Sequence, residues 1–289
     1  MAFRTVLISS RSKLEVSLGY LVCRNEKETR VLLDEISVLM IESTAVSLTA
    51  SLLSELSKKN ISVIFCDQKA LPESVFLPLY GNCSKNRKIK EQVSWTSEAK
   101  EIVWAEVVKQ KILRQSDVLK RHKLSSTCNQ LVSYASDVRP GDSTNREAFA
   151  AKVYFNSLFG EGFSRADDLY VNAFLNYGYS ILLATVSREI VASGFLTELG
   201  IKHCNEHNVL NLSCDFMEPF RPIVDDKVKR MSIKDDFKRE LVDLLNIKVQ
   251  MKRISTTLDN AIHICVGSLL STLSNGDLDK LDFISDYEL

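Results

Sequence analysis

Three polar segments in the second half of the chain carry residues that suit metal-dependent chemistry. The first contains Glu147, whose helical spacing places it on one stripe with Tyr154 and Phe155. A carboxylate on an apolar stripe is unfavourable unless it meets a cation or a metal. The alternative is a capping box from Thr144 to Glu147, in which the glutamate binds the first backbone N–H of the helix. From this segment alone, the cap is the favoured interpretation.

The second segment follows Gly200 and concentrates His203, Cys204 and His207. Two histidines separated by three residues are a weak zinc signal, because neither an HExxH pattern nor a paired cysteine motif accompanies them. Histidines in a solvent-exposed loop are the simpler alternative. The chain has only four histidines, so two of them close together still mark this segment as a candidate site.

The third segment runs from Asp215 to Asp225. Asp215 and Glu218 are three residues apart, which is again compatible with a capping box. Pro219 disfavours the α conformation at Glu218, however, so this glutamate is poorly placed inside a helix. Arg221 and Asp225 have the spacing of an i,i+4 ion pair on the helix that follows.

Taken together, Glu147, His203 and Glu218 are a suitable ligand set for a hard divalent cation. Two carboxylates and one imidazole suit Mg²⁺ or Mn²⁺, and the nitrogen favours Mn²⁺. Such an ion would polarise a phosphodiester and assist the attacking or leaving hydroxyl. Spacing alone does not show that Glu147 meets His203, which lies 56 residues away.

The elements that must position these residues divide the chain into two parts. Residues 1–78 read as a small β domain with one amphipathic helix at 47–58, whose apolar side chains recur at helical spacing. The β-rich or alternating runs predicted as strands are 5–9, 14–18, 31–33, 38–41 and 61–66. These patterns predict an α+β, two-domain protein whose smaller, N-terminal domain is a β-sheet.

The pattern dissolves between Pro72 and Lys90, where two prolines are followed by a turn and a basic tract, so residues 79–94 are predicted as an interdomain linker. From residue 95 helical periodicity dominates, beginning with the stripe of Trp104, Val108 and Ile112. Further helices are predicted at 169–193, 237–249 and 258–273, the first of them apolar almost all round. Residues 95–289 are therefore expected to form a larger, all-α catalytic domain.

The chain has 37 basic and 37 acidic residues, so its formal net charge is zero. A neutral total argues against DNA binding at first. Residues 79–123 nevertheless have six more basic than acidic groups, and residues 124–289 have six more acidic than basic groups. A neutral total can therefore conceal a local stripe that attracts phosphate.

The seven cysteines, an odd number with no CxxC pair, favour reduced thiols rather than a disulfide framework. Arg4 and Arg11 interrupt the N-terminus before a signal-peptide core can form. No apolar run approaches the roughly 20 residues of a membrane span. These features predict a cytoplasmic protein that needs no membrane partner.

Four motifs follow one another in the helical part and its polar segments. They are Asn-Arg-Glu-Ala-Phe-Ala-Ala-Lys-Val-Tyr-Phe (145–155), Asn-Ala-Phe-Leu-Asn-Tyr-Gly-Tyr-Ser-Ile-Leu-Leu (172–183), Gly-Ile-Lys-His (200–203) and Asp-Phe-Met-Glu-Pro-Phe-Arg-Pro-Ile-Val-Asp (215–225). Together they resemble the CRISPR-associated integrase of spacer acquisition, and their order, spacing and chain length most resemble its type II-A branch. The resemblance extends over the whole chain, including residues 63–67 and Trp95.

This resemblance implies a metal-dependent DNA integrase, or endonuclease, in which Glu147, His203 and Glu218 are the catalytic metal ligands. Asp215 falls on an auxiliary acidic position beside them. The β domain would form a homodimer, and two such dimers would clamp a dimer of a small ferredoxin-like companion protein. The 3′-hydroxyl of a short foreign DNA segment would attack a phosphodiester at the end of a repeat, with no covalent protein intermediate.

Candidate DNA contacts are cations near these motifs. They are Lys85, Arg87, Lys88 and Lys90 in the basic tract, with Lys152 and Arg221 beside the proposed ligands. Such residues would hold phosphates without reading the sequence. The basic tract has a solvated, flexible linker as its alternative. Lys152 stands where many relatives have arginine, which would replace a bidentate contact by a point charge.

Two other functions remain open from the sequence. One is a metal-dependent phosphodiesterase that hydrolyses branched or single-stranded nucleic acid, because water can attack in place of a DNA hydroxyl. The other is a non-enzymatic scaffold that captures DNA, with Glu147 and Glu218 acting only as helix caps.

Overall fold

The computed structural model describes residues 4–68, 71–78, 85–167, 169–232 and 236–289. Strands dominate the N-terminal part, as predicted. They are β1 (Arg4–Ile8), β2 (Lys13–Ser17), β3 (Tyr20–Arg24), β4 (Glu28–Leu32), β5 (Ile36–Ile41), β6 (Ser47–Leu48), β7 (Ser62–Cys66) and β8 (Pro72–Phe76). The predicted amphipathic helix is α1 (Ala50–Lys58), whose first turn is capped by the Thr49 side chain.

These strands form two sheets. In one sheet, with the order β1-β5-β7-β8, β1, β5 and β7 are parallel and β8 runs antiparallel to β7. The other sheet has the order β4-β3-β2-β6. Strands β3, β6 and β8 were missed in the sequence. Pro72 argued against β8, but it is the first residue of an edge strand, where proline is tolerated.

Strand β5 separates two hydrophobic cores because its side chains alternate between the two faces of the sheet. Leu39 and Ile41 pack with the N-terminal strands and helix α1. Val38 and Met40 pack instead into the large core of the helical part. The β-sheet region and the helical region therefore meet across this sheet, and a domain boundary at residue 78 stays a prediction.

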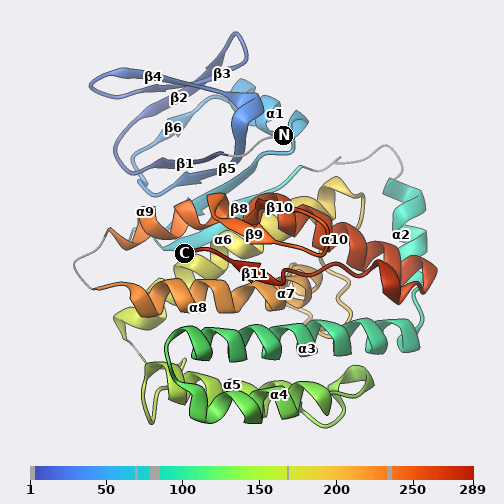
Figure 1. The fold of residues 1–289 in the computed structure, drawn as a ribbon. Helices are drawn as coiled ribbons and strands as arrows, with labels where there is room; N and C mark the ends of the chain where they lie inside the picture. Colours follow the sequence, from blue (N-terminus) through green and yellow to red (C-terminus); the bar gives the residue numbers. More distant parts are fainter. Residues whose placement is uncertain (1–3, 69–70, 79–84, 168, 233–235) are drawn as a thin grey trace.

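The remainder of the chain is mostly helical. Its helices are α2 (Lys85–Val93), α3 (Ser97–Arg121), α4 (Cys128–Ser136), α5 (Arg146–Phe159), α6 (Tyr170–Ala192), α7 (Asn211–Met217), α8 (Arg221–Arg230), α9 (Phe237–Val242) and α10 (Leu258–Asn275). Helix α6 is buried on most of its surface, as its apolar sequence predicted. Helix α3 lies between α8 on one side and the pair α4 and α5 on the other (Figure 1).

The all-α prediction for residues 95–289 is wrong in detail, because three short strands form a sheet in the order β10-β9-β11. These strands are β9 (Lys248–Gln250), β10 (Ser255–Thr257) and β11 (Asp286–Tyr287). The helix predicted at 237–249 ends at Val242 for this reason. Val249 is buried in the middle of β9, and its partner Tyr287 comes from the far end of the chain, which local periodicity cannot reveal.

The segment predicted as a linker is only partly described. Residues 79–84 lie outside the described residues, and residues 85–93 form helix α2. Within the described ranges, no helix is both long and apolar enough to cross a membrane.

Candidate active site

Glu218 occupies a junction between two helices rather than a helix interior. Helix α7 ends before it, the short 3₁₀ helix Glu218–Phe220 follows, and α8 begins at Arg221. The junction turns the Glu218 side chain inward, and only 4% of it is exposed. Its Oε1 accepts a hydrogen bond of 2.7 Å from Arg221 Nη1, and its Oε2 lies 2.5 Å from Lys111 Nζ.

Glu147 lies at the start of α5, but it does not cap that helix. Asn145, the N-cap residue, has a left-handed φ of 53° and no capping side chain. Asp142 replaces it, since its carboxylate accepts hydrogen bonds from the backbone N–H groups of Arg146 (2.8 Å) and Glu147 (3.0 Å). The predicted capping box is therefore wrong, and the Glu147 carboxylate instead accepts a hydrogen bond of 2.6 Å from Lys111 Nζ.

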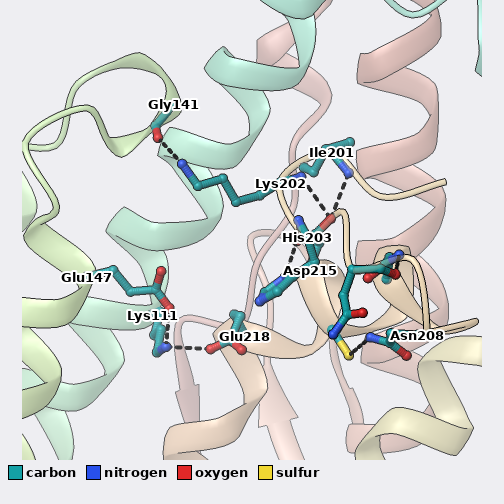
Figure 2. A network of polar contacts seen from close by, with 12 residues as sticks. Lys111, Gly141, Glu147, Ile201, Lys202, His203, Asn208, Asp215 and Glu218 are labelled. Atoms are coloured by element: carbon teal, nitrogen blue, oxygen red, sulfur yellow. Dashed lines mark hydrogen bonds and ion pairs between the residues drawn. The ribbon is translucent and has the colours of Figure 1, made fainter. Parts of the chain in front are cut away.

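Lys111, in the middle of α3, joins the two glutamates, as Figure 2 shows. Lys111 was not among the candidate residues selected from the sequence. Its spacing in the sequence could have identified it as buried. Lys111 follows Trp104 by seven residues and Val108 by three, so it lies on the same buried stripe of the helix. A lysine on such a stripe requires an anionic partner.

Charge complementarity sets the protonation of this group. Burial disfavours the ammonium, but the carboxylates of Glu218 and Glu147 outweigh it and raise the pKa of Lys111. Burial would likewise raise the pKa of Glu218, yet Lys111 and Arg221 lower it to about 2. Both partners are therefore charged at neutral pH.

Asp215 organises the loop that carries His203. This carboxylate is fully buried, and its Oδ2 accepts hydrogen bonds from the backbone N–H groups of Ile201 (2.7 Å) and Lys202 (3.0 Å). Its Oδ1 accepts from the backbone N–H of His203 (3.1 Å) and pairs with His203 Nδ1 at 2.6 Å. The hydrogen bond to Asp215 raises the pKa of His203, against a smaller effect of burial.

Three further features fix this loop. The His203 ring meets Trp104 of α3 edge to face, with ring centroids 6.0 Å apart. Gly200 approaches the loop so closely that a Cβ atom there would lie 2.3 Å from the His203 carbonyl oxygen and 2.8 Å from Asp215 Oδ2. Lys202 Nζ also donates to the Gly141 carbonyl oxygen, which links the loop to the start of α5.

The donor chemistry fits a hard divalent cation. Glu147 and Glu218 face the same ammonium, and the Asp215 contact at Nδ1 leaves Nε2 as the nitrogen of His203 that could bind an ion. A carboxylate on the second ring nitrogen is the usual partner of a metal-binding histidine. Among the described residues, no group of three or more His, Cys, Asp or Glu side chains is arranged to hold a metal, so the ligands would have to close around the ion. His207 is exposed and takes no part in this arrangement.

The cations predicted to contact DNA have different surroundings. Arg221 pairs with Glu218 rather than with Asp225, and its guanidinium lies 4.1 Å from the centre of the Tyr179 ring. Lys152 is exposed on α5. Lys88 forms an ion pair with Glu91 (2.9 Å) and lies over the Phe195 ring.

The rest of the basic tract shares helix α2 with Lys88. Arg87 and Lys90 are exposed, and Lys85 is half-buried. The tract is thus part of a helix, and its Lys88 contacts Phe195 of the helical region.

Comparisons with known proteins agree with one another. A family model described as CRISPR associated protein Cas1 matches residues 5–253. A CRISPR-associated endonuclease Cas1 from Neisseria meningitidis serogroup C (strain 8013) is 34% identical, over 97% of this chain and 95% of that protein. A casposase bound to integration product has a similar fold, with a TM-score of 0.77 and 20% identity, over 95% of this chain and 92% of that one.

A Cas6-RT-Cas1–Cas2 complex also contains a chain of similar fold. The TM-score is 0.73 at 16% identity, and the match covers 96% of this chain and 35% of the other. At these identities, both structural comparisons concern the fold alone.

Proposed function

The chain belongs to the family of CRISPR-associated protein Cas1, and on this premise we propose that it is a metal-dependent DNA integrase and endonuclease of CRISPR adaptation. It would join the 3′-hydroxyl of a short foreign DNA segment to a phosphodiester at the end of a repeat. The integration product bound by the casposase of similar fold supports this reaction class.

The observation that carries the proposal is the meeting of Glu147 and Glu218 at one cation. Two carboxylates from separate helices converge on Lys111 Nζ, and the loop held by Asp215 presents His203 beside them. Glu147, Glu218 and His203 would hold the ion. Mg²⁺ or Mn²⁺ bound there would polarise the phosphodiester and stabilise the charge that develops on its oxygens.

Other side chains of the protein would orient the residues that hold the ion. Asp215 fixes the His203 ring so that Nε2 is the free nitrogen, and Arg221 holds the Glu218 carboxylate through Oε1. Exposed cations, including Lys152, Arg87 and Lys90, would hold DNA phosphates. Since a DNA hydroxyl attacks directly, no serine or tyrosine nucleophile is required.

The proposed assembly includes further copies and a partner. We expect a homodimer through the β-sheet region and a small ferredoxin-like companion between two dimers. The complex of a Cas1 and a Cas2 in the structure of similar fold supports such a companion.

Hydrolysis is the second candidate, and the name of the Neisseria relative, an endonuclease, favours it. The same residues would then direct water at a phosphodiester of branched or single-stranded nucleic acid. The scaffold hypothesis loses its premise, because neither Glu147 nor Glu218 caps a helix through its carboxylate.

A joining assay tests the proposal. The protein, its companion and Mn²⁺ are mixed with an end-labelled short duplex and a repeat-bearing plasmid, and joined and cut products are separated. Glu218→Gln should lower the rate of joining at least about 100-fold. Loss of a residue that only supports a metal ligand lowers activity about 10–100-fold, and loss of a ligand itself should cost no less than the upper value. Glu240→Gln, which removes an exposed carboxylate paired with Lys227, is the matched control. Undiminished joining by Glu218→Gln would refute the assignment, and cut products alone would favour hydrolysis.

A further inference from the structure

Lys111 stands at the point that a shared divalent ion would take. Its Nζ lies 2.6 Å from Glu147 Oε1 and 2.5 Å from Glu218 Oε2, so these two oxygens are no farther apart than the sum of those distances. Mg²⁺ binds carboxylate oxygens at about 2.0–2.1 Å, so an ion held by both glutamates would lie between the same two oxygens. The ammonium group of Lys111 and such an ion would therefore occupy nearly the same position, and both cannot be there at once.

Charge balance leads to the same conclusion. The carboxylates of Glu147 and Glu218 carry two negative charges, and Lys111 with Arg221 supplies two positive ones. A divalent ion added to this balanced group would face an ammonium at contact distance in a poorly solvated place. Repulsion between like charges is strongest there, because little water screens them.

The Lys111 side chain is able to leave. Among the described residues, its ion pairs are with the two glutamates. Asp215, the third carboxylate of the site, already accepts four hydrogen bonds from residues 201–203 and does not hold Lys111. The Glu147 side chain is 27% exposed, compared with 4% for Glu218, so the open side of the group lies at Glu147. A flexible four-carbon stem permits the ammonium to move in that direction.

We propose that Lys111 is a positioning residue that competes with the divalent ion for Glu147 and Glu218. Its ammonium holds the two carboxylates together, and it must withdraw when the ion binds. The inference rests on the proposed function, because it assumes that these carboxylates are metal ligands. It adds that metal affinity is limited by a cation of the protein itself.

The test compares the Mn²⁺ affinity of the full-length protein with that of two variants by calorimetry. Lys111→Met keeps a long, unbranched side chain, one atom shorter than lysine, and removes the charge, so it should bind Mn²⁺ at least about tenfold more tightly. In the presence of a chelator, this variant should also melt at a lower temperature than the wild type. Added Mn²⁺ should raise its melting temperature by more than it raises that of the wild type. Lys109→Met, which removes an exposed lysine paired with Glu106 on the same helix, should behave as the wild type.

Lys111→Arg keeps the inference testable even when Lys111→Met does not fold. A guanidinium holds two carboxylates more firmly than an ammonium, so this variant should bind Mn²⁺ at least about tenfold more weakly than the wild type. An affinity order of Met, Lys, Arg supports competition, and unchanged or reversed affinities overturn it. A merely structural lysine would lower the affinity in both variants.

A Glu218→Gln variant separates this inference from the proposed function. Mn²⁺ binding that is lost in Glu218→Gln but insensitive to Lys111 retains the metal site and refutes the competition. Absence of Mn²⁺ binding in every protein refutes both.

Discussion

Asp215→Asn tests the organisation of the loop at residues 201–203 in the candidate active site. The Asp215 carboxylate accepts four hydrogen bonds, two at each oxygen, from Ile201, Lys202 and His203. An asparagine has only one oxygen, so in either orientation its NH₂ group faces two donors. Each hydrogen bond to a charged acceptor is worth about 1.5–3 kcal/mol, so the loss of two amounts to about 3–6 kcal/mol. We expect the lower end, because Lys202 and His203 are exposed and water can replace part of the loss.

The assays are urea unfolding and amide hydrogen exchange. The free energy of unfolding should fall by about 3 kcal/mol, protection should be lost at residues 201–203, and Mn²⁺ affinity should fall about 10–100-fold. Asp226→Asn is the matched control, since Asp226 is equally buried but binds His122, Arg230 and Tyr287. It should lower stability without changing protection at 201–203. Wild-type protection at 201–203 in Asp215→Asn would refute the role given to Asp215.

Three further predictions concern Gly200, Asp225 and the basic tract. Gly200→Ala should displace the loop, because its Cβ would overlap the His203 carbonyl oxygen, and crystallography together with reduced Mn²⁺ affinity should show this. Burial raises the pKa of Asp225 from 3.8 to about 6. Between pH 3.8 and pH 6 the folded protein therefore keeps a proton on Asp225 that the unfolded chain releases. The free energy of unfolding should thus fall as the pH rises through this range. Asp225→Asn should therefore be more stable than the wild type above pH 6, by up to about 3 kcal/mol, and similar near pH 4 in thermal unfolding. DNA affinity should fall steeply as the salt concentration rises. The double variant Arg87→Ala and Lys90→Ala should reduce the magnitude of the slope of log affinity against log salt concentration by about two. An affinity that does not change with salt would contradict phosphate contacts.

The sequence predicted the parts of the fold that local patterns encode. The apolar surface of α6 and the alternation in β2 are visible within a few residues. Strand β9 was not predictable in this way, because it is three residues long and pairs with β11 from the end of the chain. The all-α prediction failed at this point.

The candidate site shows the same distinction between local and distant information. Glu147, His203 and Glu218 were selected from residue type and from the resemblance, but the capping box at Glu147 was wrong because Asp142 binds those backbone groups. Lys111 was missed because its partners come from α5 and the α7–α8 junction. Only packing brings them together.

Anomalous diffraction from crystals grown with Mn²⁺ tests the central claim most directly. We predict one strong peak within about 2.0–2.3 Å of carboxylate oxygens of Glu147 and Glu218 and of His203 Nε2. We also expect Lys111 Nζ to have moved away from both carboxylates. A protein that joins DNA in Mn²⁺ but shows no peak there, or a peak bound by other residues, would contradict the account.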